Sequence, residues 1–392
     1  MKLYNSLSQT KELFIPNNDK KVMMYVCGIT PYDTTHLGHA FTYTFFDVLQ
    51  RHLTYKGYTV IYTQNVTDID DDMLKKAKSV KQDWKELGEF WTQKYLTDMK
   101  TLNNLSPNFY VKATDTIPTI IEIITDLEEK GLAYEKDGIV FFRTQKDAEY
   151  GKLSRYTREQ MLLLSKERGA NPDDPRKEDP LDFILWQKSL PDEPFWKSPW
   201  GDGRPGRHIE CSAMIDKYLY KYIDIHGGGH DLIYPHHESE IAQSESFTGK
   251  KPFVKYWLHT GAVMYQGEKM SKSLGNLVMV SDLLRLYKPA VIRYLLLTHH
   301  YRQPWEFEES QLDEAQQQIT LLTQALQKEI PTKHTEDMKE IITAFTTALD
   351  DDINTPKAIE ILMNVVQEQL TTPSKIKKKT LKEMRHILGL PL

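Results

Sequence analysis

Two short segments of the chain carry side chains suited to binding a polyphosphate. Residues 36–39 read His-Leu-Gly-His, and residues 269–273 read Lys-Met-Ser-Lys-Ser. At the start of a helix, the dipole and the free backbone N–H groups would add to the two imidazoles in attracting an anion. The second segment offers two ammonium groups and two hydroxyls that could follow a moving polyphosphate. Either segment alone is also compatible with ordinary surface or core residues.

A second group of residues has the donor atoms of a metal site. The two cysteines of the chain are Cys27 and Cys211, and residues 235–240 read Pro-His-His-Glu-Ser-Glu. Thiolate, imidazole and carboxylate are the usual ligands of zinc. The spacing is not that of a zinc finger, so each ligand would have to come from a different element of the fold. The alternative is that both cysteines are small buried side chains.

The apolar pattern predicts a parallel α/β sheet as the scaffold for these residues. Residues 22–27 form a short apolar run that ends at Gly28, which is typical of a buried parallel strand. The other predicted parts of this unit are a helix at 38–56, strands at 58–66, 222–226 and 253–263, and a helical stretch that begins near Pro235. Cys27 would then end the first strand, and both phosphate-type segments would follow strands.

The remainder is predicted as an insertion in the sheet and a C-terminal all-α module. Residues 71–221 contain polar helices, a β-hairpin at 133–143 and a loop rich in proline and aspartate. Amphipathic helices are predicted at 282–299, 309–328, 335–349 and 358–370. Residues 373–379 hold four lysines, which we interpret as a solvated helix face.

The composition of the chain excludes several classes of protein. The 392 residues are 40% hydrophobic and 27% charged, and no apolar run is long enough to span a membrane. The first residues do not resemble a secretory signal, so we expect a cytoplasmic protein without disulfides. The net charge of −5 argues against a general nucleic-acid coat but allows a local basic patch.

Taken together in this order, the two phosphate-type segments resemble the paired signatures of class I aminoacyl-tRNA synthetases. The chain is similar to the superfamily of cysteinyl-tRNA synthetases and mycothiol cysteine ligases, which implies a Rossmann-like catalytic domain. That resemblance implies a catalytic domain at 1–276 with the insertion at about 71–221, a linker and stem-contact-like helical region at 277–330, and a helical bundle at 331–392.

The resemblance also implies roles for particular residues. The zinc ligands would be Cys27, Cys211, His236 and Glu240, and the zinc would take the thiolate of a cysteine substrate. The catalytic residues would be His36, His39, Lys269 and Lys272. The positions that contact ATP, with Mg²⁺, and the adenylate would be Gly28, Ile29, Thr30, Thr42, Asn65, Val66, Thr67, Gly229, His230, Asp231, Val263, Lys269, Ser271, Lys272 and Ser273.

Two acceptors of the activated cysteine remain possible at this point. Residues 30–39, 167–172 and 299–302 point towards the mycothiol branch, although Ala170 and Asn171 depart from its usual Gly-Gly-Asp-Pro continuation. The carboxylate of Glu240 is typical of the synthetases instead. We place tRNA-Cys first, because every cell needs Cys-tRNA, and glucosaminyl-inositol second. A non-catalytic synthetase paralogue ranks below both, because both signatures are intact.

Three further features bear on the acceptor and on the cysteine pocket. The helical module ends at Leu392 without the extra domain by which typical cysteinyl-tRNA synthetases grip the anticodon, so a small acceptor or unusual tRNA recognition is expected. The lysines at 375–379 could contact a tRNA stem. Arg207 stands where both branches normally have a tryptophan against the bound cysteine, which predicts an altered pocket. We expect a monomer.

Overall fold

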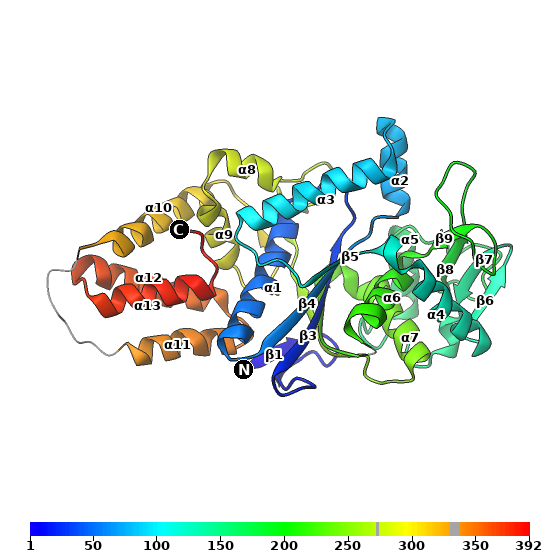
Figure 1. Cartoon of the computed structure of the whole chain (residues 1–392), viewed down its shortest axis with the longest axis horizontal. Helices are drawn as coiled ribbons and strands as arrows, with labels where there is room; N and C mark the ends of the chain where they lie inside the picture. Colours follow the sequence, from blue (N-terminus) through cyan, green and yellow to red (C-terminus); the bar gives the residue numbers. More distant parts are fainter. Residues whose placement is uncertain (221, 272–273, 330–337) are drawn as a thin grey trace.

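A parallel sheet lies at the centre of the computed structural model, which describes residues 1–392 except 221, 272–273 and 330–337 (Figure 1). Its five strands are arranged in the order β11-β10-β3-β4-β5, and each pairs in parallel with its neighbours. They are β3 (Lys21–Ile29), β4 (Thr59–Val66), β5 (Phe109–Lys112), β10 (Ile223–Gly229) and β11 (Val254–Thr260). This parallel sheet confirms the predicted α/β class. The prediction rested on nearly continuous apolar runs, which strands need when both faces of their sheet are covered.

Helix α1 (Leu37–Tyr55) connects β3 to β4 and packs on the sheet. Its buried side includes Phe41, Phe46 and Leu49, which belong to the largest hydrophobic cluster of the protein. The helix ends just before Gly57, whose φ of +92° lies in the left-handed region. Because α1 begins at Leu37, the histidine segment at residues 36–39 lies at the start of a helix, as predicted.

The insertion contains a second, antiparallel sheet of four strands in the order β6-β7-β8-β9. This sheet comprises β6 (Ala133–Lys136), β7 (Ile139–Phe142), β8 (Phe183–Lys188) and β9 (Gly203–Pro205). The helices of this part of the chain are α2 (Asp71–Val80), α3 (Trp84–Thr101), α4 (Ile117–Glu129), α5 (Arg158–Glu167) and α6 (Arg207–Leu219). Although β5 lies inside the range 71–221, it forms the edge of the central sheet.

The predicted strand at 253–263 is two strands in the structure. β11 ends at Thr260, and Val263 begins β12 (Val263–Tyr265), which belongs to a small sheet with β13 (Glu268–Lys269) and β14 (Trp305–Glu306). Gly261 lies at the break, where an added Cβ would come within 2.4 Å of the Gln303 backbone. A further two-stranded sheet joins β1 (Lys2–Asn5) to β2 (Thr10–Leu13).

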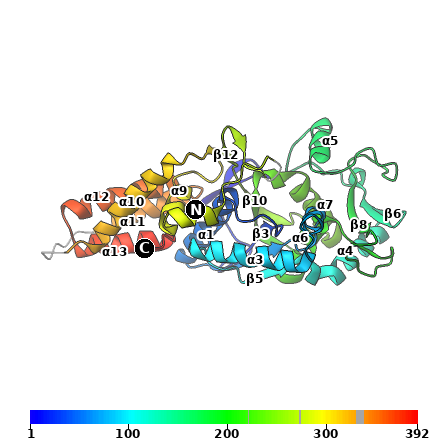
Figure 2. The same ribbon diagram turned by 90° about the horizontal axis from the view of Figure 1, so that it is seen from above.

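The C-terminal part is mostly helical among the described residues, apart from β14, and its bundle lies at the left of Figure 1, at the opposite end from the antiparallel sheet. The helices are α8 (Val280–Leu286), α9 (Pro289–Leu297), α10 (Ser310–Gln327), α11 (Lys339–Asp350), α12 (Thr355–Thr371) and α13 (Lys375–Ile387). The single helix predicted at 282–299 is wrong, because Pro289 begins a new helix and cannot continue the preceding one. The predicted boundary at 330/331 lies outside the described residues. Seen from above in Figure 2, the bundle, central sheet and insertion follow one another along the long axis.

Among the described residues, no helix is both long and apolar enough to cross a membrane.

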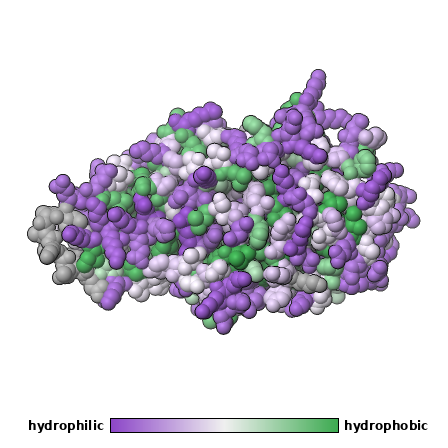
Figure 3. All heavy atoms as spheres, viewed as in Figure 1, coloured by the Kyte–Doolittle hydropathy of each residue, from purple (hydrophilic) through white to green (hydrophobic). Residues whose placement is uncertain are grey.

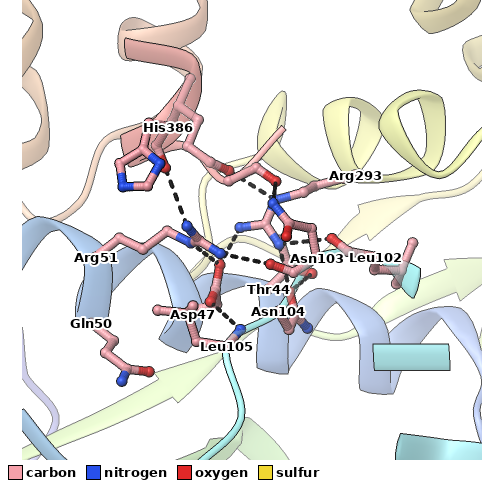
Figure 4. Close-up of polar contacts among 12 residues, drawn as sticks. Thr44, Asp47, Gln50, Arg51, Leu102, Asn103, Asn104, Leu105, Arg293 and His386 are labelled. Carbon is pink, nitrogen blue, oxygen red and sulfur yellow. Dashed lines mark hydrogen bonds and ion pairs between the residues drawn. The ribbon is translucent and has the colours of Figure 1, made fainter. Parts of the chain in front are cut away.

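A buried network of charges fastens the helical bundle to the central domain (Figure 4). Asp47 of α1 accepts hydrogen bonds from Arg51 and from Arg293 of α9. Arg51 also donates to the His386 carbonyl at 3.3 Å, and Arg293 donates to the Leu388 carbonyl at 2.8 Å. The side chains of Asp47, Arg51 and Arg293 are at most 7% exposed. The end of α13 is thus bonded to the helix that begins with the histidine segment.

Candidate active site

A cavity of about 720 Å³ lies at the carboxyl ends of β3, β10 and β11. This is where ligands bind in open parallel α/β sheets. Most of the predicted nucleotide-site residues that the structure describes line it. They are Gly28, Thr30, His36, His39, Thr42, Gly229, His230, Asp231, Val263, Lys269 and Ser271, together with Cys27.

Four other predicted residues, which lie in β3 and β4 or directly after β4, do not line the cavity. Ile29 and Val66 are fully buried in the sheet. Asn65 accepts a hydrogen bond from the Gly28 backbone N–H at 2.7 Å and donates to Thr67 at 3.2 Å. A Cβ on Gly28 would come within 1.6 Å of the Asn65 carbonyl oxygen, so the close approach of β3 and β4 here requires glycine. Lys272 and Ser273 lie outside the described residues.

The rings of the two histidines of residues 36–39 lie against each other at the start of α1, tilted by 31°. Their ring centroids are 3.7 Å apart, with His36 at the N-cap position and His39 in the first turn. No side-chain hydrogen bond caps this helix. The first N–H groups of a helix have no intrahelical partner, so this end of α1 presents donors and a positive dipole to the cavity.

Lys269 lies across the cavity and forms an ion pair with Asp231. Its Nζ is 3.2 Å from Asp231 Oδ2, and Arg168 donates to the Asp231 carbonyl oxygen at 2.7 Å. Burial acts to raise the pKa of Asp231, but Lys269 and Arg168 hold it below its usual value. Asn276 organises the following loop by accepting from the Ser271 N–H at 2.9 Å. The carboxylate therefore stays ionised, and the ammonium is held at the mouth of the site.

A buried cluster of metal-ligand side chains lies at one end of this cavity. Ligand atoms of Cys27, His236, His237 and Glu240 all lie within 4.8 Å of one another. Cys27 Sγ is 3.9 Å from Cys211 Sγ and 3.3 Å from His237 Nε2. Glu240 Oε1 is 3.1 Å from His236 Nε2. The residues come from β3, α6, the turn before α7 (Glu238–Thr248) and α7 itself.

Two pairs of ligand atoms, Cys27 with Cys211 and His236 with Glu240, have the spacing that a tetrahedral ion requires. Two sulfurs at about 2.3 Å from one zinc would lie about 3.8 Å apart, and a nitrogen and an oxygen at about 2.1 Å would lie about 3.4 Å apart. The sulfur pair and the His236–Glu240 pair are close to these values. All of these ligand side chains are at most 6% exposed. The cluster can bind a metal.

Further histidines surround the cluster and orient its members. His226 contacts Glu240 Oε2 at 2.9 Å, and His259 contacts His237 Nδ1 at 2.8 Å. His208 contacts His236 Nδ1 at 2.8 Å. Such outer contacts fix the ring orientation and tautomer of metal-binding histidines.

When no cation is bound, burial disfavours the charged forms of the histidines and of the Cys27 thiol in and around the cluster. Burial lowers the pKa of His226 and of His208 to about 3, and it lowers the pKa values of His236 and His237 well below the usual range. Burial, with the neighbouring Cys211 and Glu240, raises the pKa of Cys27. Neutral imidazoles are the form that binds metal. A bound divalent cation would lower the pKa of the Cys27 thiol instead of raising it.

The sequence predictions missed several of these residues. Three of the predicted ligands, Cys27, His236 and Glu240, lie in the cluster, whereas its fourth member, His237, was not predicted as a ligand. The position of His237 next to His236 was the available signal. The predicted ligand Cys211 is not a member of that group, although its Sγ is 3.9 Å from Cys27 Sγ. His226 and His259 are single histidines inside strands, where no spacing distinguishes them from ordinary core residues.

Arg207, at the start of α6, also lines the cavity. Its guanidinium lies 4.0 Å from the Asp70 carboxylate. An arginine at this position, where the sequence comparison expected tryptophan, thus places a cation in the wall of the site, close to the buried cluster.

Two family profiles match the chain. Residues 13–317 match the catalytic domain of the class I tRNA synthetases of type C, and residues 344–392 match the DALR domain.

Curated relatives and solved structures agree with these matches. The chain is 47% identical to a cysteine–tRNA ligase of Dehalococcoides mccartyi, over 100% of this chain and 87% of the relative. It is 46% identical to a cysteine–tRNA ligase of Pyrococcus furiosus, over 98% of this chain and 83% of the relative. The fold is similar to Mycobacterium tuberculosis methionyl-tRNA synthetase in complex with methionyl-adenylate, with a TM-score of 0.67, 16% identity and coverage of 94% and 89%. It is also similar to an Agrobacterium radiobacter LeuRS in a ternary complex, with a TM-score of 0.66, 13% identity and coverage of 96% and 84%.

Proposed function

The chain belongs to the cysteine-type class I tRNA synthetases, and on that premise we propose that it activates L-cysteine with ATP and joins it to tRNA-Cys. The observation that carries this proposal is a shared cavity. Cys27 belongs to the buried metal-ligand cluster and also lines the cavity that holds His36, His39 and Lys269. A thiol-binding site and a polyphosphate site are therefore next to each other.

In the first step, the carboxylate of cysteine attacks the α-phosphorus of ATP. The bond from that phosphorus to the bridging oxygen breaks, and pyrophosphate leaves with its electron pair. No protein nucleophile is required, so the work of the chain is to position the reactants and stabilise the charge. The donors at the start of α1, with His36 and His39, would bind the phosphates. Lys269 and Lys272 would hold the departing pyrophosphate, and Mg²⁺ would accompany the ATP.

The other predicted positions support the adenylate. Gly28 allows the nucleotide to approach the backbone of β3, and Asn65 holds that backbone in place. Asp231, kept ionised by Lys269, would accept hydrogen bonds from ribose hydroxyls.

The metal in this proposal is zinc, which Cys27, Cys211, His236 and Glu240 would hold. A zinc ion there would bind the substrate thiolate in preference to the hydroxyl of serine, because soft sulfur is the better ligand. The chain itself supplies a pocket with neutral imidazoles and a wall that contains Arg207. His226 and His259 hold the surrounding side chains in orientation.

In the second step, the terminal hydroxyl of the tRNA attacks the carbonyl carbon of the adenylate. The ester forms, the mixed anhydride bond breaks, and AMP leaves with the electron pair of that bond, while the hydroxyl proton passes to the departing phosphate or to water. We place this activity in the cytoplasm, with one chain as the working unit.

The test is transfer of radiolabelled cysteine by the purified protein with ATP. The reaction is run in parallel with total tRNA and with glucosaminyl-inositol as acceptors. Acid-precipitable label on tRNA is the expected result. Label on glucosaminyl-inositol alone would identify that compound, and not tRNA, as the acceptor. Absence of cysteine-dependent exchange between pyrophosphate and ATP would contradict activation altogether.

A further inference from the structure

Helix α5, which belongs to the insertion, reaches the cavity of the candidate active site. Tyr156 just before the helix, Leu164 within it and Arg168 at its C-terminal end all line this cavity. The hydroxyl groups of Ser165 and Tyr234 lie 2.9 Å apart, and this contact ties α5 to the segment that follows β10. The proposed reaction gives no task to α5, although the helix forms part of the wall of the cavity.

Arg168 differs from other surface cations in what it contacts. Hydrophilic residues cover much of the face seen in Figure 3, so an exposed arginine is not by itself a sign of function. The Nη1 group of Arg168 donates to the carbonyl oxygen of Asp231 at 2.7 Å and lies 3.8 Å from Oδ2 of the same residue. One guanidinium group therefore contacts both the backbone and the carboxylate of Asp231.

The carboxylate of Asp231 has a second cationic partner, which has another task in the proposed reaction. Lys269 Nζ is 3.2 Å from the same oxygen, Oδ2. An ammonium group is a single compact charge on a flexible stem, so it cannot remain on this carboxylate while it holds the departing pyrophosphate. Once Lys269 turns to the phosphates, Arg168 is the one of these two cations that stays with Asp231.

The loss of both cations would change the charge state of Asp231. Burial acts to raise the pKa of this carboxyl group, and Lys269 and Arg168 act to lower it. A protonated carboxyl group would keep only part of its capacity to accept hydrogen bonds. A cation that does not leave with the phosphates therefore preserves the acceptor.

The carboxylate of Asp231 is also confined on its other side. A Cβ on Gly229 would come within 2.6 Å of Asp231 Oδ1, so this oxygen lies close over the end of β10. Oδ2 is the oxygen near the two cations. Gly229 and Asp231 both line the cavity. The cations and the end of β10 together set the direction of the carboxylate in the wall of the cavity.

We propose that Arg168 is a positioning residue for the ribose of ATP, because it holds Asp231 ready to accept the ribose hydroxyls while Lys269 contacts the phosphates. The proposal rests on the proposed function, which assigns the hydroxyls to Asp231 and the pyrophosphate to Lys269. Arginine suits this task, since its planar guanidinium is always charged and presents several donors in a fixed geometry. The insertion thereby completes the nucleotide site of the central domain.

Equilibrium binding of ATP and of 2′,3′-dideoxyATP, which lacks both ribose hydroxyls, tests the proposal. The full chain is titrated with each nucleotide and Mg²⁺ by calorimetry, without cysteine, so that no turnover occurs. The wild type should bind ATP more tightly than the analogue. Arg168→Gln should bind ATP about tenfold more weakly and the analogue as the wild type does, because only a hydrogen bond to the charged Asp231 is affected. Damage to the fold would weaken both nucleotides alike.

Arg158→Gln is the matched control. Arg158 lies in the same helix and also pairs with an aspartate, Asp179, at 2.7 Å, but it does not line the cavity. We expect wild-type affinities for both nucleotides in this variant. An unchanged preference for ATP in Arg168→Gln, equal weakening of both nucleotides there, or the same loss in Arg158→Gln would overturn the proposal. A wild type that binds the two nucleotides equally would also remove the role of Asp231 from the proposed function.

Discussion

Arg51 and Arg293 bind the same carboxylate oxygen, Oδ2 of Asp47, although they are 242 positions apart in the sequence, 293 minus 51. Arg51 lies one turn further along α1 from Asp47, and Arg293 comes from α9. Both guanidinium groups also donate to backbone carbonyls, those of residues 102, 103, 386 and 388, and Arg293 donates to the side-chain oxygen of Asn104 as well. The helix that begins with His36 and His39 is thereby joined to the bundle through buried charge.

Replacing Asp47 should destabilise the protein strongly. The Asp47→Asn variant leaves two buried guanidinium groups without their counter-charge, which typically costs about 3–5 kcal/mol. Urea denaturation measures the change in the free energy of unfolding. Glu383→Gln, which alters an exposed hydrogen bond to Tyr55, is the control and should cost less than about 1 kcal/mol. Similar values for the two variants would show that the network does not hold the bundle.

Zinc content should distinguish the residues that bind the metal from those that only orient the ligands. We expect Cys211→Ser and His236→Ala to lose the metal, as measured by elemental analysis of the purified protein. His237→Ala should keep it with about ten- to a hundredfold weaker affinity, because the proposed ligand set does not include His237 although its ring lies within the cluster. His39→Ala is the control with full zinc. Loss of zinc in His237→Ala, with retention in His236→Ala, would give the ligand position to His237.

The lysine segment should affect activation but not metal binding. Lys269→Ala removes the cation that pairs with Asp231, and Lys272→Ala removes the second predicted phosphate contact. Each should lower cysteine-dependent pyrophosphate exchange by about a hundredfold, the usual effect of losing one charge-stabilising donor. Zinc content should stay at the wild-type level. Lys136→Ala, in the distant strand β6, is the control, and wild-type rates in the other two variants would refute their role.

Acid should weaken the contact between α1 and the bundle through His52. Burial lowers the pKa of this side chain, although Asp350 at 2.9 Å acts in the opposite direction. The unfolded chain therefore takes up the proton first as the pH falls below about 6.5, so the stability of the folded state decreases below that pH.

The measurement compares the free energy of unfolding of wild type and His52→Gln at pH 7.5, 6.5 and 5.5. The variant cannot take up this proton, so we expect its stability to fall less steeply with acid. His386→Gln, an exposed histidine, is the control. A variant with the wild-type slope would mean that His52 does not contribute to acid sensitivity.

The sequence predicted the central elements well where both faces of a strand are covered. β3 and β4 appear as apolar runs, and α1 ends where Gly57 allows a left-handed turn. β5 was not predicted because it has four residues with mixed exposure, which leave no periodic pattern. The break at Pro289 was missed because apolar spacing continues across it from α8 into α9.

The site could be predicted only in part, for a physical reason. Cys27 and Cys211 stand out as the two thiols of the chain, and the structure brings them to within 3.9 Å. His226 and His259 act through their neighbours, and their partners come from distant segments. Spacing along the chain carries information about one element at a time, whereas these contacts depend on how the strands pack.

The network around Asp47 also fixes an order of events during synthesis. Helix α1 leaves the ribosome early, yet Arg51 must wait for the carbonyl group of His386 before its hydrogen bonds are complete. A nascent chain that has not reached this point lacks the carbonyl group that accepts from Arg51. The contact between the first helix of the central domain and the last helix of the bundle therefore forms only after nearly the whole chain has been synthesised.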